Sequence, residues 1–148
     1  MRGAVLVALL LAAPVAAAEP PAWKSNCLMC HQADGKGQPG LYPRLSGRMD
    51  KAAASAEGRA WLISVLLHGQ TGKILIDGKP ISGVMMPYRH LPDADIAAVL
   101  NHAVAMGAAS KPRAFTAAEV KAARALPRQT ATEVRQQREQ LVAAGLLP

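Results

Sequence analysis

Five consecutive residues carry the strongest chemical signal in this chain: Cys27, Leu28, Met29, Cys30 and His31. Two thiols separated by two residues and followed directly by a histidine form the attachment pattern for c-type haem. One helical turn between the cysteines matches the separation of the two porphyrin vinyl groups, and each thiol adds to one of them. The adjacent histidine is then held under the iron, and imidazole is a good iron ligand. We therefore predict one covalent haem c on Cys27 and Cys30, with His31 as an axial ligand.

Other sites that use two cysteines are less well supported. A structural zinc site needs a second pair of ligands, and the sequence has neither a second Cys-x-x-Cys nor a His-x-x-x-His. A thioredoxin-like pair needs a strand-helix-strand context, whereas a glycine-rich stretch follows His31. A simple disulfide in an oxidising compartment stays open as an alternative. The low aromatic content, 3%, favours haem because few bulky side chains are available to fill a core.

The first 18 residues have the organisation of an export signal. Arg2 precedes an apolar run over residues 4–13, and Pro14 and small residues ending at Ala18 follow. This order is typical of a secretory signal peptide, with cleavage near Ala18, and an uncleaved anchor is the alternative. The run is shorter than the about 20 apolar residues that span a bilayer. We expect a mature periplasmic protein without a transmembrane segment.

The charge of the chain favours acidic partners. The formal charge is +7, and it falls to +6 when Arg2 is removed with the signal peptide. The lysines and arginines are scattered and no basic run alternates with aromatic residues, so we expect no nucleic-acid partner. A chain of 148 residues with 51% hydrophobic residues and no sustained repeat is typical of one folded domain.

With these features the chain resembles the class I monohaem c-type cytochromes, over about residues 23–106. Trp23 stands four residues before the first cysteine, as an aromatic residue does in bacterial members. Residues 42–47, Tyr-Pro-Arg-Leu-Ser-Gly, are similar to the family's Pro-x-Leu-x-Gly element. The resemblance implies that the carbonyl of Pro43 accepts the second N–H of the proximal histidine, which fixes the ring and raises its basicity. A proline that only shapes a turn is the alternative.

The second axial ligand is expected in residues 83–88, Gly-Val-Met-Met-Pro-Tyr. In the family the methionine directly before proline ligates iron, which implies Met86. A residue before proline is pushed towards extended geometry, so Met85 and Met86 point to opposite sides and only one can face the haem. Met85 is the alternative ligand, and two ordinary core methionines are a further one. Structural roles are expected for the other histidines, His68, His90 and His102.

The resemblance implies an all-α class I cytochrome c fold, with three or more helices around one covalent haem, a small β-hairpin and a helical C-terminal extension. The sequence predicts helices over residues 23–31 and 59–67, and a third that begins near Pro92. Residues 73–76 and 79–81 are predicted as the two strands of the hairpin, and Asp77-Gly78 supplies its turn. Four side chains are able to bond the haem propionates, with ordinary surface or packing roles as the alternative: Tyr42, Arg44, Arg48 and Trp61.

We expect a signal peptide over residues 1–18, a cytochrome c domain over 19–106 and a helical extension over 107–148. Two capping boxes, at Thr116 and Thr130, predict two helices in the extension. A solvated helix folded against the haem domain is the expected arrangement of its last part, and a partner-binding arm is the alternative.

Histidine and methionine together leave no open position on a haem iron, so electron transfer is favoured over binding of small molecules. We therefore expect an electron carrier and not an enzyme, passing electrons from a dehydrogenase or other donor towards a terminal oxidase. Its partners would be redox proteins with acidic docking surfaces. One alternative is a tightly bound cytochrome subunit of a periplasmic molybdenum- or quinone-dependent dehydrogenase. A less favoured one is a haem sensor or peroxidase, in which Met86 would leave the iron.

Overall fold

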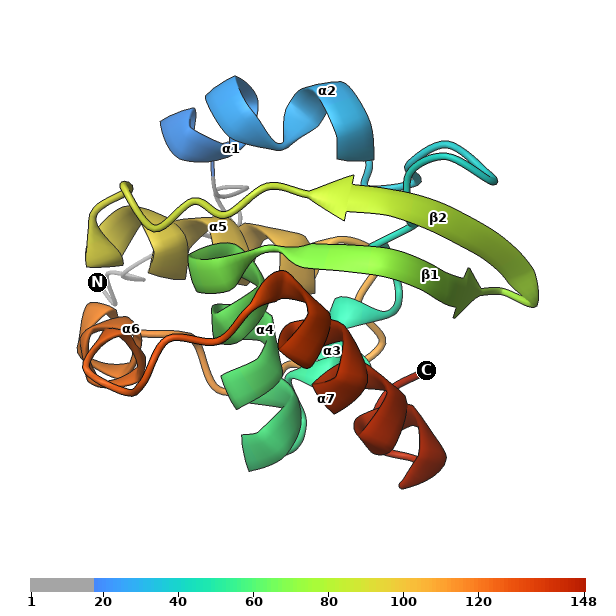
Figure 1. Cartoon of the computed structure of the whole chain (residues 1–148). Helices are drawn as coiled ribbons and strands as arrows, with labels where there is room; N and C mark the ends of the chain where they lie inside the picture. Colours follow the sequence, from blue (N-terminus) through green and yellow to red (C-terminus); the bar gives the residue numbers. More distant parts are fainter. Residues whose placement is uncertain (1–17) are drawn as a thin grey trace, which may run out of the picture.

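The computed structural model describes residues 18–148, so the predicted signal peptide, apart from Ala18, lies outside the described residues. The described part is mostly helical with one antiparallel hairpin, as predicted (Figure 1). Its elements are α1 (Pro21–Asn26), α2 (Leu28–His31), α3 (Met49–Ala52), α4 (Ala56–His68), β1 (Gln70–Ile76), β2 (Lys79–Met85), α5 (Asp93–Ala105), α6 (Ala117–Arg124) and α7 (Ala131–Ala143).

The predicted N-terminal helix is divided into α1 and α2. Pro21 opens α1, because proline needs no intrahelical N–H partner in the first turn. Cys27, with φ −114°, separates the two helices. The ring of Trp23 is buried and meets the ring of His102 on α5 edge to face, with 5.0 Å between their centroids. This contact fixes the haem-binding motif against α5.

The long helix α4 begins three residues before the predicted start because the hydroxyl of Ser55 accepts a hydrogen bond of 2.9 Å from the backbone N–H of Gly58. Its apolar side chains are buried on nearly every side, as expected for a helix at the centre of a core. Those side chains are Trp61, Leu62, Ile63, Val65, Leu66 and Leu67.

The hairpin is longer than predicted. Its ladder runs from the pair Ile76 and Lys79 to the pair Gln70 and Met85. Asp77 and Gly78 form the turn with φ of 52° and 74°, as the Asp-Gly pair predicts. The chain passes from α4 into β1 at Gly69, where a Cβ would lie 2.5 Å from the carbonyl oxygen of Met85. A glycine is required there, and it brings the two ends of the hairpin together.

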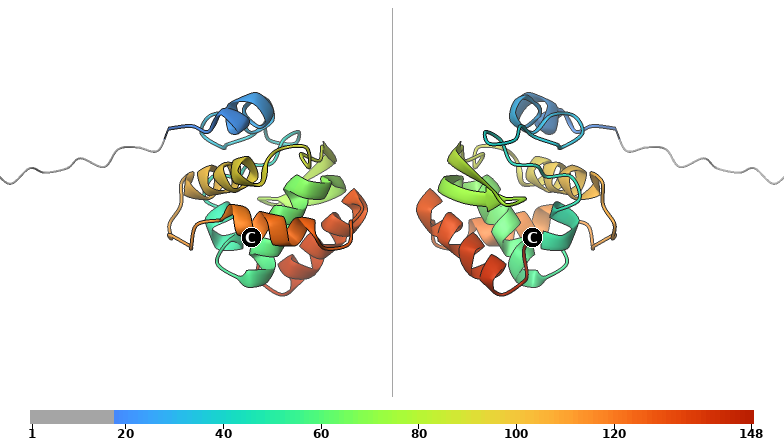
Figure 2. Two further views of the ribbon diagram at one scale, coloured as in Figure 1. Left: turned by 90° about the vertical axis from the view of Figure 1, so that its left-hand side faces the viewer. Right: turned by 90° about the vertical axis from the view of Figure 1, so that its right-hand side faces the viewer.

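The two C-terminal helices are part of the core. Both predicted capping boxes are present, at the starts of α6 and α7. Helix α6 packs on α5 and α4, and α7 packs on α4 and β1 (Figures 1 and 2). The side chains they bury are Val120, Val134 and Leu141, with Leu147 beyond α7. The extension therefore packs on the elements that precede it and closes one side of the core.

A buried arginine joins α4 to the start of α6. Arg59 donates two hydrogen bonds from Nη2 to the carboxylate of Glu119, at 2.9 and 3.1 Å, and one from Nη1 to the carbonyl of Arg113 at 2.6 Å. Its guanidinium lies 3.9 Å from the ring centroid of Phe115. Burial alone would raise the pKa of Glu119, but hydrogen bonds from Arg113, Arg59 and the backbone of Thr116 outweigh it and lower this pKa to about 2.

Replacing Glu119 with glutamine is therefore expected to destabilise the fold in a pH-dependent way. The native pKa of about 2 lies below the ordinary 4.5, so the carboxylate contributes its full stability above pH 4.5 and loses it as pH falls towards 2. The free energy of unfolding at pH 7 should fall by about 1–2 kcal/mol. The effect is no larger because water partly screens a carboxylate that is 25% exposed.

Urea unfolding followed by circular dichroism at pH 7 and pH 3 measures this loss. Glu57→Gln is the matched control, since Glu57 is exposed and makes no salt bridge within residues 18–148. If Glu119→Gln lowered the free energy of unfolding equally at pH 7 and pH 3, the lowered pKa of Glu119 would be contradicted.

Candidate haem site

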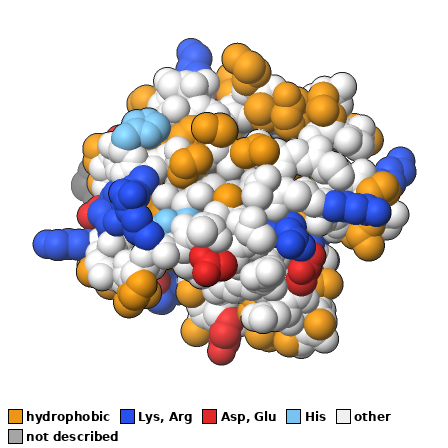
Figure 3. Space-filling view, viewed as in Figure 1, with side chains coloured by type: hydrophobic (Ala, Val, Ile, Leu, Met, Phe, Trp, Pro, Cys, Tyr) orange, Lys and Arg blue, Asp and Glu red, His pale blue; other side chains and the backbone are white. Residues whose placement is uncertain are grey.

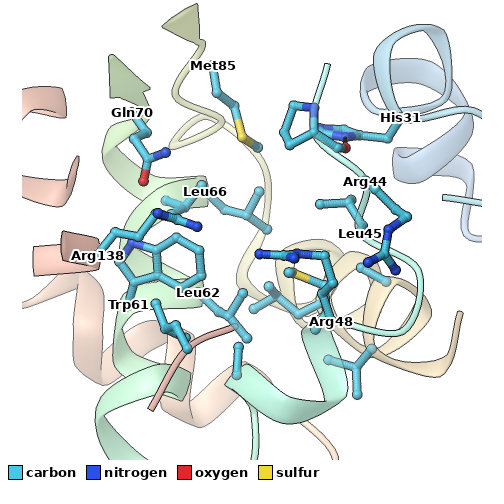
Figure 4. A pocket seen from close by; sticks show the side chains of 18 of the residues that line it. His31, Arg44, Leu45, Arg48, Trp61, Leu62, Leu66, Gln70, Met85 and Arg138 are labelled. Carbon is cyan, nitrogen blue, oxygen red and sulfur yellow. Dashed lines mark hydrogen bonds between the residues drawn. The ribbon is translucent and has the colours of Figure 1, made fainter. Parts of the chain in front are cut away.

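Two adjoining cavities lie between the N-terminal helices, α4, α5 and the hairpin. The inner cavity reaches down to α4, α7 and the residues after α7 (Figure 4). The outer cavity opens beside α2 and β2. Six residues line both cavities: Cys27, His31, Pro43, Gln70, Ile74 and Met85. Four of these six belong to the predicted haem motif, its supporting loop or the methionine pair. One continuous space therefore connects the residues that the sequence singles out.

The two cysteines are held one helical turn apart. The carbonyl of Cys27 accepts hydrogen bonds from the backbone N–H groups of Cys30 and His31, at 3.2 and 2.9 Å. Neither thiol is in a disulfide. Burial, and then the neighbouring Cys30, raise the pKa of Cys27 to about 11. Both thiols are thus free to form thioethers along one edge of a porphyrin.

The side chain of His31 is buried, and its Nδ1–H donates a hydrogen bond of 3.1 Å to the carbonyl of Pro43. This leaves Nε2 as the nitrogen with a free lone pair. Burial lowers the pKa of His31, against a smaller opposite effect of that hydrogen bond, so the ring is in the neutral form that binds metals. Gly37, with φ 62°, makes the contact possible, because a Cβ there would lie 2.6 Å from the carbonyl oxygen of Pro43.

The structure separates the two methionines. Met85 ends β2, is half-buried and lines both cavities, and its thioether points into the inner cavity at the same end as His31 (Figure 4). Met86 is 61% exposed and lines only the outer cavity. The two side chains point apart, as the following proline predicts. This geometry favours Met85, the alternative ligand, over Met86.

A signal in the sequence points the same way. Ile81 is buried within β2, and alternation along a strand puts Met85, four residues later, on the same face. The expectation of Met86 rested on the resemblance to a Met-Pro element and made no use of this period of two.

Positive side chains gather at the opposite end of the inner cavity. Arg44, Arg48 and Arg138 line it, and the last two are buried (Figure 4). Among the described residues, Asp77 is the carboxylate that forms salt bridges with this group, at 2.9 Å to Arg44 and 3.0 Å to Arg48. Burial lowers the pKa of Arg48 and of Arg138, which shows that water does not fully solvate either cation. Arg48 also donates from Nη2 to an oxygen of Pro148 at 2.5 Å, and Arg138 donates from Nη2 to the carbonyl of Leu75 at 3.1 Å. Within the described residues, three guanidinium groups thus share one side-chain carboxylate.

Some polar atoms at this end have no partner. The indole N–H of Trp61 and Nε of Arg48 are buried without a hydrogen bond. Unpaired buried donors are costly, and so are buried cations in excess of their counter-charges. Haem carries two carboxylates on one edge, so the chemistry of this end fits haem propionates. Arg138 was missed by the sequence analysis, because nothing in a charged C-terminal helix indicates that it reaches the cavity.

Apart from Gln70, most of the remaining lining is apolar and fits the rest of a porphyrin. Leu62, Val65 and Leu66 come from α4, and Val99, Leu100 and Ala103 from α5. Among residues 18–148 no three His, Cys, Asp or Glu side chains are grouped to hold a metal ion directly. An iron that brings four porphyrin nitrogens needs only two protein ligands, which this cavity offers.

The family model for cytochrome c matches residues 21–107. The chain belongs to the cytochrome c family. It is 44% identical over 126 residues to a cytochrome c-552 of Thermus thermophilus, a match that covers 81% of this chain and 85% of the relative. A second Thermus thermophilus cytochrome c-552 is 46% identical over 105 residues, which cover 68% of this chain and 80% of that protein. The predicted class I cytochrome c fold, with its small hairpin, is confirmed.

These matches also fix the general chemistry. This cytochrome c carries covalent haem c, and it is an electron carrier and not an enzyme. Residues 1–107 make up less than three quarters of the chain, so the match over 81% of it includes part of the C-terminal segment. The similarity thus extends beyond residue 106, where the predicted resemblance ends. Within the described residues no helix is long and apolar enough to cross a membrane.

Proposed function

We propose that this cytochrome c is a periplasmic one-electron carrier whose iron is ligated by His31 and Met85. It takes electrons from a dehydrogenase or another donor and passes them towards a terminal oxidase. One observation carries the proposal: the imidazole of His31 and the thioether of Met85 enter the same cavity from α2 and β2. Two protein ligands leave no open iron position, which favours electron transfer over ligand binding.

When bound, haem c would supply a redox couple that gains and loses one electron, and no covalent bond of the protein is made or broken. The chain supplies the surroundings of that couple. Pro43 fixes the ring of His31 through its hydrogen bond and increases the basicity of the ligand. Arg48, Arg138 and Trp61 would hold the haem propionates. The apolar side chains of α4 and α5 exclude water, so that little solvent must reorient when the charge of the iron changes.

The function is tested on the exported protein, purified from a host with a c-type haem maturation system. A reduced-minus-oxidised spectrum should show one low-spin haem c, and the chromophore should stay on the chain after denaturation. Carbon monoxide should bind slowly or not at all while both axial ligands are in place. A colourless protein, or a ferrous form that binds carbon monoxide at once, would contradict the proposal.

The alternative of a tightly bound dehydrogenase subunit has less support. Helices α6 and α7 pack on α4, α5 and β1, and their side chains Val120, Val134 and Leu141 are buried within this chain and not offered to a permanent partner. We therefore expect the native periplasmic protein to elute as a species of about its own mass. Partners with acidic docking surfaces are favoured by its charge of +6 after signal removal.

Replacing Arg138 with glutamine is expected to lower the reduction potential by tens of millivolts, since a buried cation beside the cavity stabilises the reduced, less positive haem. Spectroelectrochemical titration measures the change. Arg135→Gln is the control, because Arg135 lies on the same helix and pairs with Glu139 at the surface. Equal potentials in both variants would place Arg138 outside the propionate site.

A further inference from the structure

One polar side chain in the cavity has no role in the haem site described above. Gln70 is the first residue of β1, is half-buried and lines both cavities. Its Oε1 atom is buried and has no hydrogen-bond partner among the described residues. Burying an unpaired amide is unfavourable. We therefore expect the groups around Gln70 in the haem-loaded cavity to supply its partners.

The hairpin places Gln70 directly beside Met85. The two residues are paired at the end of the antiparallel ladder, and residues opposite each other in such a ladder carry their side chains on the same face, with Cβ atoms about 4.5–5.5 Å apart. Both side chains point into the inner cavity (Figure 4). The amide of Gln70 is therefore within reach of the thioether of Met85.

The two ends of the amide have different neighbours. The side chain of Gln70 lies between those of Met85 and Arg138 in Figure 4, and the guanidinium of Arg138 is buried. A guanidinium has only donors, whereas a thioether sulfur is an acceptor. The orientation that gives both ends a partner therefore turns Oε1 towards Arg138 and an N–H towards the sulfur of Met85.

The surroundings of this pair are apolar. None of the described residues that line the outer cavity is Asp, Glu, Lys or Arg, and hydrophobic side chains gather on the molecular face over α2 and the end of β2 (Figure 3). A hydrogen bond and its dipole act more strongly where charges and water screen them little. An amide at this place therefore has a measurable effect on the iron.

We propose that the side-chain amide of Gln70 donates a hydrogen bond to the thioether of Met85 and thereby raises the reduction potential. This inference rests on the proposed function, in which Met85 ligates the iron. The N–H binds the lone pair of the sulfur that the iron does not use, and it draws electron density away from the metal. Both this effect and the positive end of the N–H dipole favour the ferrous state, which carries one positive charge less. Gln70 is thus a positioning residue that acts through the ligand.

Spectroelectrochemical titration of the haem-loaded protein tests the proposal. Gln70→Leu removes the donor at a similar side-chain volume and should shift the redox equilibrium about tenfold towards the ferric form, a fall in potential of about 59 mV. The far-red band should stay but move in wavelength, since the sulfur still ligates and donates more strongly. Gln137→Leu is the matched control, because Gln137 on α7 also has a buried Oε1 without a partner but lines neither cavity. It should change neither the potential nor the band.

Two further variants separate the hydrogen bond from a general effect on the cavity. Gln70→Asn keeps the amide but is one methylene shorter, so its potential should also fall, and a wild-type potential would overturn the proposal. In the Met85→His background the ligating nitrogen has no second lone pair, so Gln70→Leu should shift the potential much less.

An equal shift in both backgrounds would overturn the proposal, since the amide would then act on the propionates or on the cavity as a whole. An unmoved band and potential in Gln70→Leu would overturn it as well. Failure of the proposed function gives a different result, because the wild type itself would then lack the far-red band of methionine ligation.

Discussion

Replacing Met85 with alanine is expected to abolish the weak far-red band of methionine-ligated ferric haem and to lower the reduction potential by on the order of 0.1–0.3 V. The thioether favours the reduced iron, and alanine leaves the position to water or another ligand. Replacing Met86 with alanine should keep the band and the potential, because the side chain of Met86 is 61% exposed and lines only the outer cavity. Optical titration of both variants measures these effects.

A third variant separates ligation from folding. Met85→His should restore a six-coordinate, low-spin spectrum without the far-red band and at a lower potential than the wild type, since imidazole replaces the thioether. Loss of the band in the Met86 variant alone would make Met86 the ligand, as the resemblance to a Met-Pro element first implied. Ligation by Met86 would require the end of β2 to rotate, because Met85 and the buried Ile81 lie on the same face of this strand and Met86 points away from it.

Replacing Cys27 and Cys30 together with serine is expected to leave no haem on the denatured chain. Serine hydroxyls do not add to the vinyl groups, so acidified acetone should extract all chromophore that copurifies. Without its cofactor the inner cavity would lie empty between α4, α5 and the hairpin, and a large apolar void is strongly destabilising. We expect most of the double variant to be degraded in the periplasm.

Haem staining of denaturing gels checks this prediction. Met29→Ala is the matched control within the same motif, because its side chain is 92% exposed and it should keep a full stain. A stained band from the double variant would show that another residue carries the cofactor, and the assignment of both cysteines would then fail.

Features decided by neighbouring residues were predictable from the sequence. The two capping boxes need only a threonine and a glutamate three residues apart, and both formed at Thr116 and Thr130. The turn at Asp77 needs only an Asp-Gly pair between two strands. The haem motif belongs to the same group, because its chemistry lies within five residues.

Features decided by distant contacts were not predictable. The pairing of residues 70–72 with 83–85 extends the hairpin through glycines that no strand propensity favours. The short helix α3 has too few residues for a periodic pattern, and it exists because it packs on α4 and α5. Arg138 reaches the cavity only because α7 folds back on α4 and β1. In each case the deciding partner is far away in the chain.

The salt bridges of Asp77 have a mechanical consequence for the iron. Asp77 lies in the turn of the hairpin whose second strand ends at Met85, and it forms a salt bridge with Arg44. The residue before Arg44 is Pro43, and its carbonyl accepts the hydrogen bond from His31. One carboxylate therefore links the hairpin that carries Met85 to the loop that positions His31. A movement of the hairpin away from residues 43–44 would first have to break these salt bridges, so they favour a constant distance between His31 and Met85.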